Sequence, residues 1–163
     1  DAISVHGGSG FIMEYKCQRL YRDARIFSIY EGTTQLQVVA AIRFVTNGTY
    51  LAIIKEMLQN SVADDLKAYK TRVEALVSQY ESVLDALKAD TEQEKHDFIA
   101  RHLYEMTADI VMSLLILDDA TRSPELFGKS ARNYVRYAEA DFAKHALFVA
   151  NAKAEDLSDY RQV

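Results

Sequence analysis

The chain has 163 residues, a formal net charge of −5 and a hydrophobic content of 49%, with one proline and one cysteine. This length is enough to bury a core without disulfides, because a chain of about 150 residues hides roughly 68–70% of its unfolded surface. The negative charge argues against nucleic acid or an anionic membrane as a partner, since both need a concentrated basic face. The single Cys17 excludes an intramolecular disulfide framework and favours a reducing, cytoplasmic location. No apolar run reaches the roughly 20 residues that a membrane span needs.

Glycine and charge divide the chain into two parts. Five of the six glycines lie in residues 1–60, and only Gly128 lies in residues 61–163. The formal net charge is +1 over residues 1–60 and −6 over residues 61–163. Because glycine adopts backbone conformations that other residues avoid, we predict unusual turns in the first part and regular structure in the second.

Residues 32–59 carry the first clear helical pattern, in which apolar residues recur from Leu36 through Phe44 to Leu58. Gly48 interrupts this pattern, and a glycine inside a helix costs about 1 kcal/mol relative to alanine. We therefore predict a helix that Gly48 kinks or breaks.

Residues 61–163 contain three longer amphipathic patterns, with apolar residues at spacings of three and four. The first begins after Ser61, the second at Thr91, which forms a capping-box pattern with Glu94, and the third at Ser123 and Pro124. Their apolar stripes comprise Val62, Leu66, Tyr69, Val73, Leu76, Tyr80, Val83 and Leu87, then Phe98, Leu103, Met106, Ile110, Leu114 and Leu117, then Phe127, Ala131, Val135, Ala138, Phe142, Ala146 and Val149.

Three long helices with short joints pack as antiparallel neighbours. Strand patterns are hard to find anywhere in the sequence. We predict an all-α fold, a helical bundle of about four long helices with an irregular glycine-containing N-terminal segment.

A four-helix bundle can hold a carboxylate-bridged metal centre, which needs Glu-x-x-His pairs on facing helices. Three positions before His96, His102 and His145 stand Gln93, Ile99 and Phe142. None of these is a carboxylate. We therefore predict no metal site and interpret the histidines as surface or core-edge residues.

Residues 29–37 (IYEGTTQLQ) place the carboxylate of Glu31 at the start of a predicted helix. Gly32 permits close approach of a ligand or of another backbone. The first N–H groups of the helix and the side chains of Thr33 and Gln35 lie at the same end, which favours an anion or the polar edge of a ring. A simpler interpretation remains for Glu31 alone, since an acidic residue at a helix start complements the helix dipole.

Three blocks in the first quarter of the chain resemble the C-terminal end of the acyl-CoA dehydrogenase family: residues 5–10 (VHGGSG), 19–26 (RLYRDARI) and 29–37. The resemblance implies that residues 1–60 end the catalytic domain of a flavoprotein oxidoreductase. Such an enzyme uses FAD to desaturate an acyl-CoA thioester between its α and β carbons. The family further implies a homo-oligomer and an electron-transfer flavoprotein as electron acceptor.

The resemblance also assigns roles to individual residues. It implies that Glu31 is the catalytic base that removes the α-proton and that Gly32 lies against the substrate thioester. Cofactor contacts are implied for Thr33 and Gln35 and, toward the FAD of a neighbouring subunit, for Val5, His6, Gly7 and Gly8. Ser4 departs from the family, which commonly has glutamine two residues before the histidine, and this weakens the inferred contact at that position.

Residues 61–163 resemble the helical C-terminal extension of longer family members. We expect this extension to cover part of the catalytic domain or to set the oligomeric state. We also expect the isolated chain to be inactive, because most of the flavin and CoA pocket of the family belongs to segments that precede Asp1. The alternative is a helical interaction or oligomerisation module without catalytic activity.

Overall fold

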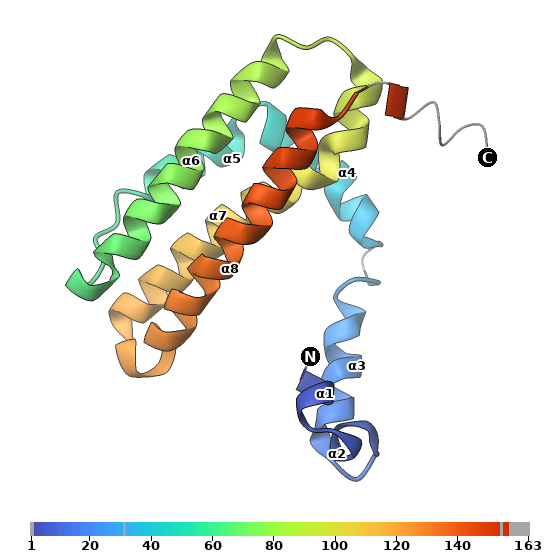
Figure 1. The fold of residues 1–163 in the computed structure, drawn as a ribbon, viewed down its shortest axis with the longest axis vertical. Coiled ribbons are helices and arrows are strands. Elements are labelled where there is room, and N and C mark those ends of the chain that lie inside the picture. Colours follow the sequence, from blue (N-terminus) through green and yellow to red (C-terminus); the bar gives the residue numbers. More distant parts are fainter. Residues whose placement is uncertain (1, 31, 154, 157–163) are drawn as a thin grey trace. The chain divides into compact units, whose positions relative to one another are not determined.

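A computed structural model describes residues 2–30, 32–153 and 155–156. Every regular element among the described residues is helical, which confirms the predicted all-α fold. The chain divides into two compact units, Asp1–Val38 and Val39–Val163, which are considered separately below (Figure 1).

The first unit is built from three helices that pack on one another, α1 (Ala2–Val5), α2 (Gly8–Phe11) and α3 (Lys16–Ile26). The chain reverses between α1 and α2 at Gly7, whose φ of 56° lies in the left-handed region. A Cβ atom at Gly10 would clash with the backbone carbonyl of Ile3, so the close approach of α2 to α1 requires glycine there. The glycine segment thus forms the predicted unusual turns.

The pattern over residues 32–59 forms two helices, α4 (Thr34–Thr46) and α5 (Thr49–Met57), which meet at an angle of 75°. Gly48 separates them with a φ of 84°, which only glycine adopts without strain. The side-chain oxygen of Asn47 accepts hydrogen bonds from the backbone N–H and the hydroxyl of Thr49, at 2.9 and 2.7 Å. The break expected at Gly48 is therefore present, and Asn47 helps to begin the second helix.

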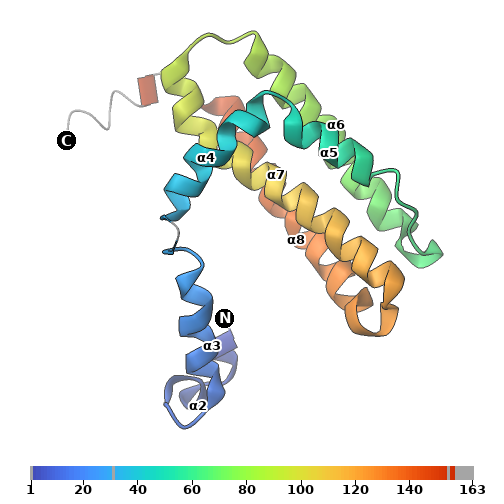
Figure 2. The same cartoon turned by 180° about the vertical axis from the view of Figure 1, so that it is seen from behind.

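Three long helices form the body of the second unit: α6 (Lys67–Lys88), α7 (Gln93–Arg122) and α8 (Pro124–Asn151). Helices α7 and α8 form an antiparallel hairpin, and α6 packs against both. Helix α5 packs against α7, as Figure 2 shows from behind. The three long patterns of the sequence thus became three packed helices.

One of the three predicted helix starts is confirmed. Ser123 is the N-cap of α8 and Pro124 occupies its first turn, although the Ser123 side chain makes no capping hydrogen bond. The prediction of a capping box at Thr91 is wrong, because Glu92 is the N-cap of α7. The N–H of Glu92 donates to the Asp90 carboxylate at 2.9 Å.

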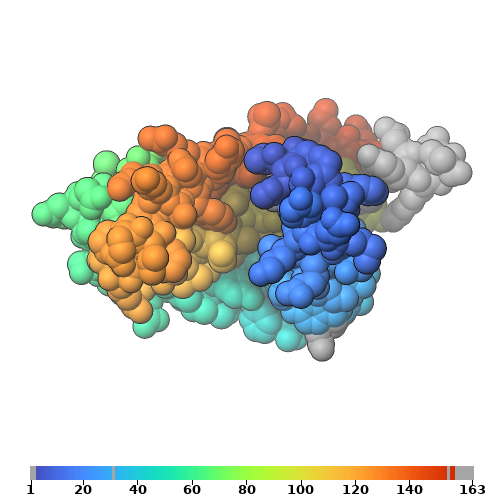
Figure 3. All heavy atoms as spheres, turned by 90° about the horizontal axis from the view of Figure 1, so that it is seen from below, coloured from blue at the N-terminus to red at the C-terminus, as the bar shows by residue number. Residues whose placement is uncertain are grey.

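The predicted start after Ser61 is also wrong. A short 3₁₀ helix, η1 (Asp64–Leu66), precedes α6, and Ala63 before it is extended. The N–H of Ala63 donates to the Thr121 hydroxyl at 3.2 Å, so this segment is tied to the end of α7. Arg132 also pairs with Asp65 at 3.2 Å, and Figure 3 shows the tip of the α7–α8 hairpin beside the start of α6.

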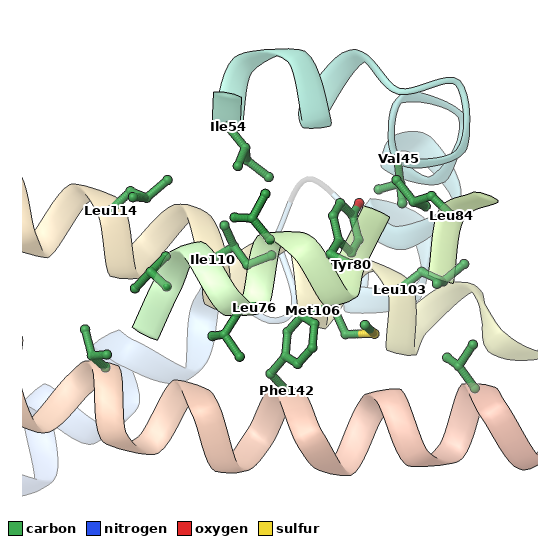
Figure 4. Close-up of a cluster of buried hydrophobic side chains, with 14 of the residues drawn as sticks. Val45, Ile54, Leu76, Tyr80, Leu84, Leu103, Met106, Ile110, Leu114 and Phe142 are labelled. Carbon is green, nitrogen blue, oxygen red and sulfur yellow. The ribbon is translucent and has the colours of Figure 1, made fainter. Parts of the chain in front are cut away.

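The core of the second unit lies between α6, α7 and α8, and α5 covers one side of it. Phe142 of α8 is fully buried and points toward Met106 and Leu76 (Figure 4). Val45 and Ile54 add the buried side chains of α4 and α5. The buried positions follow the apolar stripes of the sequence, including Val73, Leu76, Tyr80, Leu103, Met106, Ile110, Leu117, Ala131, Val135 and Phe142.

No single helix among the described residues is long and apolar enough to cross a membrane. The bent pair of α4 and α5 meets the length and composition requirement when taken together.

Candidate functional site

Gly32 forms the corner from which α4 begins. Its φ is 105°, a conformation that side chains rarely adopt. A Cβ atom at Gly32 would also lie 3.0 Å from the Leu36 side chain. The φ value therefore favours glycine, and the contact with Leu36 leaves little room for a larger residue. Glu31, the predicted base, lies outside the described residues.

The start of α4 is open and polar. The Thr33 carbonyl accepts the first bond of the helix, from the Gln37 N–H at 3.2 Å, which places Thr33 at the capping position. The side chains of Thr33 and Gln35 are both exposed. Because the first N–H groups of a helix have no partner inside it, this end favours anions and acceptor atoms.

The second group of predicted site residues surrounds the turn between α1 and α2. Val5 is 85% exposed at the end of α1, and His6, Gly7 and Gly8 are also exposed. A Cβ atom at Gly7 or Gly8 would meet nothing within 4 Å. The turn therefore offers bare backbone that a flat group or another chain can approach.

The groove beside the turn between α1 and α2 is formed without the residues at the start of α4. His6 lines a groove of about 550 Å³ against α3, together with Ile3, Lys16, Cys17 and Tyr21. Gly32, Thr33 and Gln35 do not line this groove. Sequence reasoning missed the groove, because a contact between α1 and α3 depends on the turn at Gly7 and leaves no periodic signal.

The first unit leaves most of its large apolar side chains exposed. Phe11 and Met13 are each 79% exposed, and Phe27 is 72% exposed. Further exposed side chains are Tyr15, Leu20, Tyr21, Ile26, Ile29, Tyr30 and Leu36. An apolar surface of this kind is typical of a segment that packs against other protein.

Family models match almost the entire chain. Residues 1–45 match "Acyl-CoA dehydrogenase, C-terminal domain" and residues 46–157 match "Acyl-CoA dehydrogenase C terminal". Both family models describe parts of acyl-CoA dehydrogenases, which are a class of enzymes. The chain belongs to the acyl-CoA dehydrogenase family and includes the C-terminal extension found in its longer members.

Individual relatives agree with this assignment. A butyryl-CoA dehydrogenase from Syntrophomonas wolfei is 27% identical over 156 residues, which are 90% of this chain and 25% of that protein. The caffeyl-CoA reductase-Etf complex subunit CarC from Acetobacterium woodii is 61% identical over 36 residues, 22% of this chain and 10% of that protein.

A solved structure matches the fold as well. The crystal structure of an acyl-CoA dehydrogenase family protein from Porphyromonas gingivalis has a TM-score of 0.65 and 34% sequence identity, covering 70% of this chain and 98% of that one. The chain spans only a tenth to a quarter of the length of the curated relatives named above.

Proposed function

We propose that this chain is part of an FAD-dependent acyl-CoA dehydrogenase that desaturates an acyl-CoA thioester between its α and β carbons. The observation that carries the proposal is the helix start at Gly32, where a glycine-specific turn leads into an open helix end. This helix start lies in the block of sequence that resembles the catalytic segment of the family. The proposal extends the family assignment to a reaction and to particular residues.

Glu31 is the proposed catalytic base. The α-proton of a thioester is weakly acidic, so its removal needs a carboxylate held against the carbon in a water-excluded site. Gly32 carries no side chain that would keep the thioester away from this position. The adjacent start of α4 has positive potential, which favours the carboxylate form of a base beside it.

The described residues fit a flavin at two places. Thr33 and Gln35 offer exposed donors at the start of α4, and Gly7 and Gly8 offer open backbone at the α1–α2 turn. FAD, when bound, would accept the hydride from the β carbon. In the proposed assembly Thr33 and Gln35 hold the cofactor of their own subunit, while Val5, His6, Gly7 and Gly8 contact that of a neighbouring subunit.

We also propose a homo-oligomer with shared sites. One group of proposed cofactor residues lies at the start of α4 and the other at the α1–α2 turn. His6 lines a groove in which Gly32 takes no part, which supports assigning the two groups to the sites of different subunits, as the family resemblance implies. Electron-transfer flavoprotein is the proposed electron acceptor, and a cytoplasmic location is proposed from the cysteine content. A relative from Acetobacterium woodii is described as a subunit of an Etf complex.

Residues 1–60 are proposed to end the catalytic domain, and residues 61–163 to form the helical extension. The exposed apolar side chains of the first unit support a catalytic domain that continues beyond it. The well-packed core of α6, α7 and α8 supports an extension that folds around its own core. On this basis the isolated chain is expected to lack activity.

The experiment uses the full-length protein that contains this chain. Wild-type protein is expected to purify with a flavin absorbance that acyl-CoA bleaches under anaerobic conditions. Glu31→Gln is expected to retain the flavin but to abolish bleaching, whereas Glu56→Gln, an exposed control on α5, is expected to bleach at the wild-type rate. Bleaching at the wild-type rate in Glu31→Gln would remove Glu31 from the role of base. Wild-type protein without flavin would instead favour the non-catalytic helical module.

A further inference from the structure

Two histidines join α7 to α8 by a direct hydrogen bond. The Nδ1 atoms of His102 and His145 lie 2.8 Å apart, and the ring centroids are separated by 5.0 Å. Both side chains are half-buried. Among the described residues no three His, Cys, Asp or Glu side chains gather as a metal site. The short contact is therefore a bond between the two imidazoles, and its existence depends on where the protons are.

The bond tolerates one added proton but not two. A neutral pair has one Nδ1–H group that donates to the lone pair of the other Nδ1. A singly protonated pair keeps this arrangement, and the bond becomes charge-assisted. A doubly protonated pair has a hydrogen on each facing nitrogen, so no acceptor remains between the Nδ1 atoms and two positively charged rings face each other.

We propose that the His102–His145 pair is an acid-released clasp, which holds the last turns of α8 to the first turns of α7 until the pair takes up its second proton. The proposal concerns the helical extension and does not depend on the enzymatic reaction.

The surroundings disfavour the doubly charged state. Burial is the main cause that lowers the pKa of His102, and the charge of His145 lowers it further. Burial also lowers the pKa of His145, with Lys144 as the next cause. Arg101 adds to the same effect on both rings.

Two carboxylates act in the opposite direction. Glu105 of α7 raises the proton affinity of both rings, and Asp141 of α8 raises that of His145. Asp141 is largely committed to Lys144, with an oxygen 2.8 Å from its amine. Because each folded-state pKa lies below the unfolded value of 6.5, the pair stabilises the folded state above that pH and loses this contribution as the pH falls.

Release of the clasp would affect an aromatic stack and a groove. The ring of Phe148 stacks on His102 with a centroid distance of 3.8 Å, and Phe98 lies 5.4 Å from Phe148. Both phenylalanines line a groove of about 610 Å³ near the end of α8, together with Leu147 and Ala152. Opening of the clasp would separate His102 from Phe148 and expose more of this apolar surface, so the extension would respond to acid conditions.

The test is hydrogen exchange of the 163-residue chain between pH 7 and pH 5, followed by NMR and corrected for intrinsic exchange rates. Protection of the amides of residues 143–151 is expected to fall at least tenfold toward pH 5 in the wild type. Amides in the middle of α6 are expected to keep their protection over the same range. The Cε1–H resonances of His102 and His145 are expected to titrate together in two steps.

His145→Asn supplies an amide near the position of Nδ1 that does not titrate, so His102 keeps a partner whatever its charge. This variant is expected to keep the protection of residues 143–151 at pH 5, and His102→Asn, the reciprocal variant, should do the same. In this exchange measurement the control His6→Asn, which removes a histidine from the first unit, is expected to show the same loss of protection in residues 143–151 as the wild type. A wild type that keeps its protection at pH 5, or asparagine variants that lose it as the wild type does, would overturn the proposal.

Discussion

The hydroxyl of Tyr80 lies 2.6 Å from the Thr107 hydroxyl oxygen, in the buried contact between α6 and α7. Thr107 donates its own hydrogen to the Leu103 carbonyl at 2.8 Å, so the Tyr80 hydroxyl is the donor to Thr107. Burial raises the pKa of Tyr80 to about 12. The two helices are therefore joined in the core by a polar contact whose donor and acceptor are fixed.

Removing the two sides of this contact is expected to have unequal effects. Tyr80→Phe deletes the donor and leaves Thr107 bound to Leu103, so the free energy of unfolding should fall by about 0.5–1.5 kcal/mol. Thr107→Val leaves the Tyr80 hydroxyl buried without an acceptor and should cost about 1–3 kcal/mol. Urea denaturation of both variants measures the difference. Equal losses, or a larger loss for Tyr80→Phe, would contradict the assigned donor direction.

Local signals in the sequence predicted helices well where a residue restricts its own backbone. Pro124 is disfavoured inside a helix but favoured in its first turn, and α8 begins there. Gly48 adopts a conformation that only glycine tolerates, and the helix breaks there. The start of α7 was mispredicted because Thr91 competes with Asp90, whose carboxylate binds the N–H of Glu92.

Contacts between distant segments left no such signal. His102 and His145 are 43 residues apart in sequence, and their bond exists only because α7 and α8 fold into an antiparallel hairpin. The glycine content predicted unusual turns in residues 1–60, and the φ of 105° at Gly32 agrees with that prediction. The role of Glu31 stays a prediction, since that residue lies outside the described part of the chain.

Asp109 on α7 is a half-buried carboxyl that makes stability depend on pH. One of its oxygens is buried without a hydrogen-bond partner, and burial, with the charges of Asp141 and Glu105, raises its pKa from 3.8 to about 7. The folded state therefore binds the proton more tightly than the unfolded state. The contribution of Asp109 to the free energy of unfolding is therefore fully present below about pH 4. It is lost as the pH rises through 7.

Asp109→Asn removes this dependence. A tenfold change in proton affinity corresponds to about 1.4 kcal/mol, so the variant should gain about 2–4 kcal/mol at pH 8 and change little at pH 4. Thermal unfolding across this pH range measures the gain. Asp119→Asn, an exposed control on the same helix, should follow the wild type. A gain that is the same at pH 4 and pH 8 would show that ionisation of Asp109 is not its cause.

Two glycines of the second unit are expected to respond to alanine in opposite directions. Gly48 has a φ of 84°, so Gly48→Ala should cost about 1–3 kcal/mol through backbone strain. Gly128 lies in α8, and a Cβ atom there would meet only the end of the Arg132 side chain, at 3.5 Å. Gly128→Ala should therefore stabilise the chain by about 0.5–1 kcal/mol. Urea midpoints that shift in the same direction for both variants would contradict this assignment.

Phe142 tests whether α8 is an integral part of the core. Its ring is fully buried and lies among side chains of α6 and α7 (Figure 4). Phe142→Ala should lower the free energy of unfolding by about 3–5 kcal/mol, because it leaves a cavity that the surrounding helices fill only in part. Tyr137→Ala on the same helix removes a side chain that is 74% exposed and should change stability by less than about 0.5 kcal/mol. Similar small losses in both variants would mean that α8 is not anchored through Phe142 in solution.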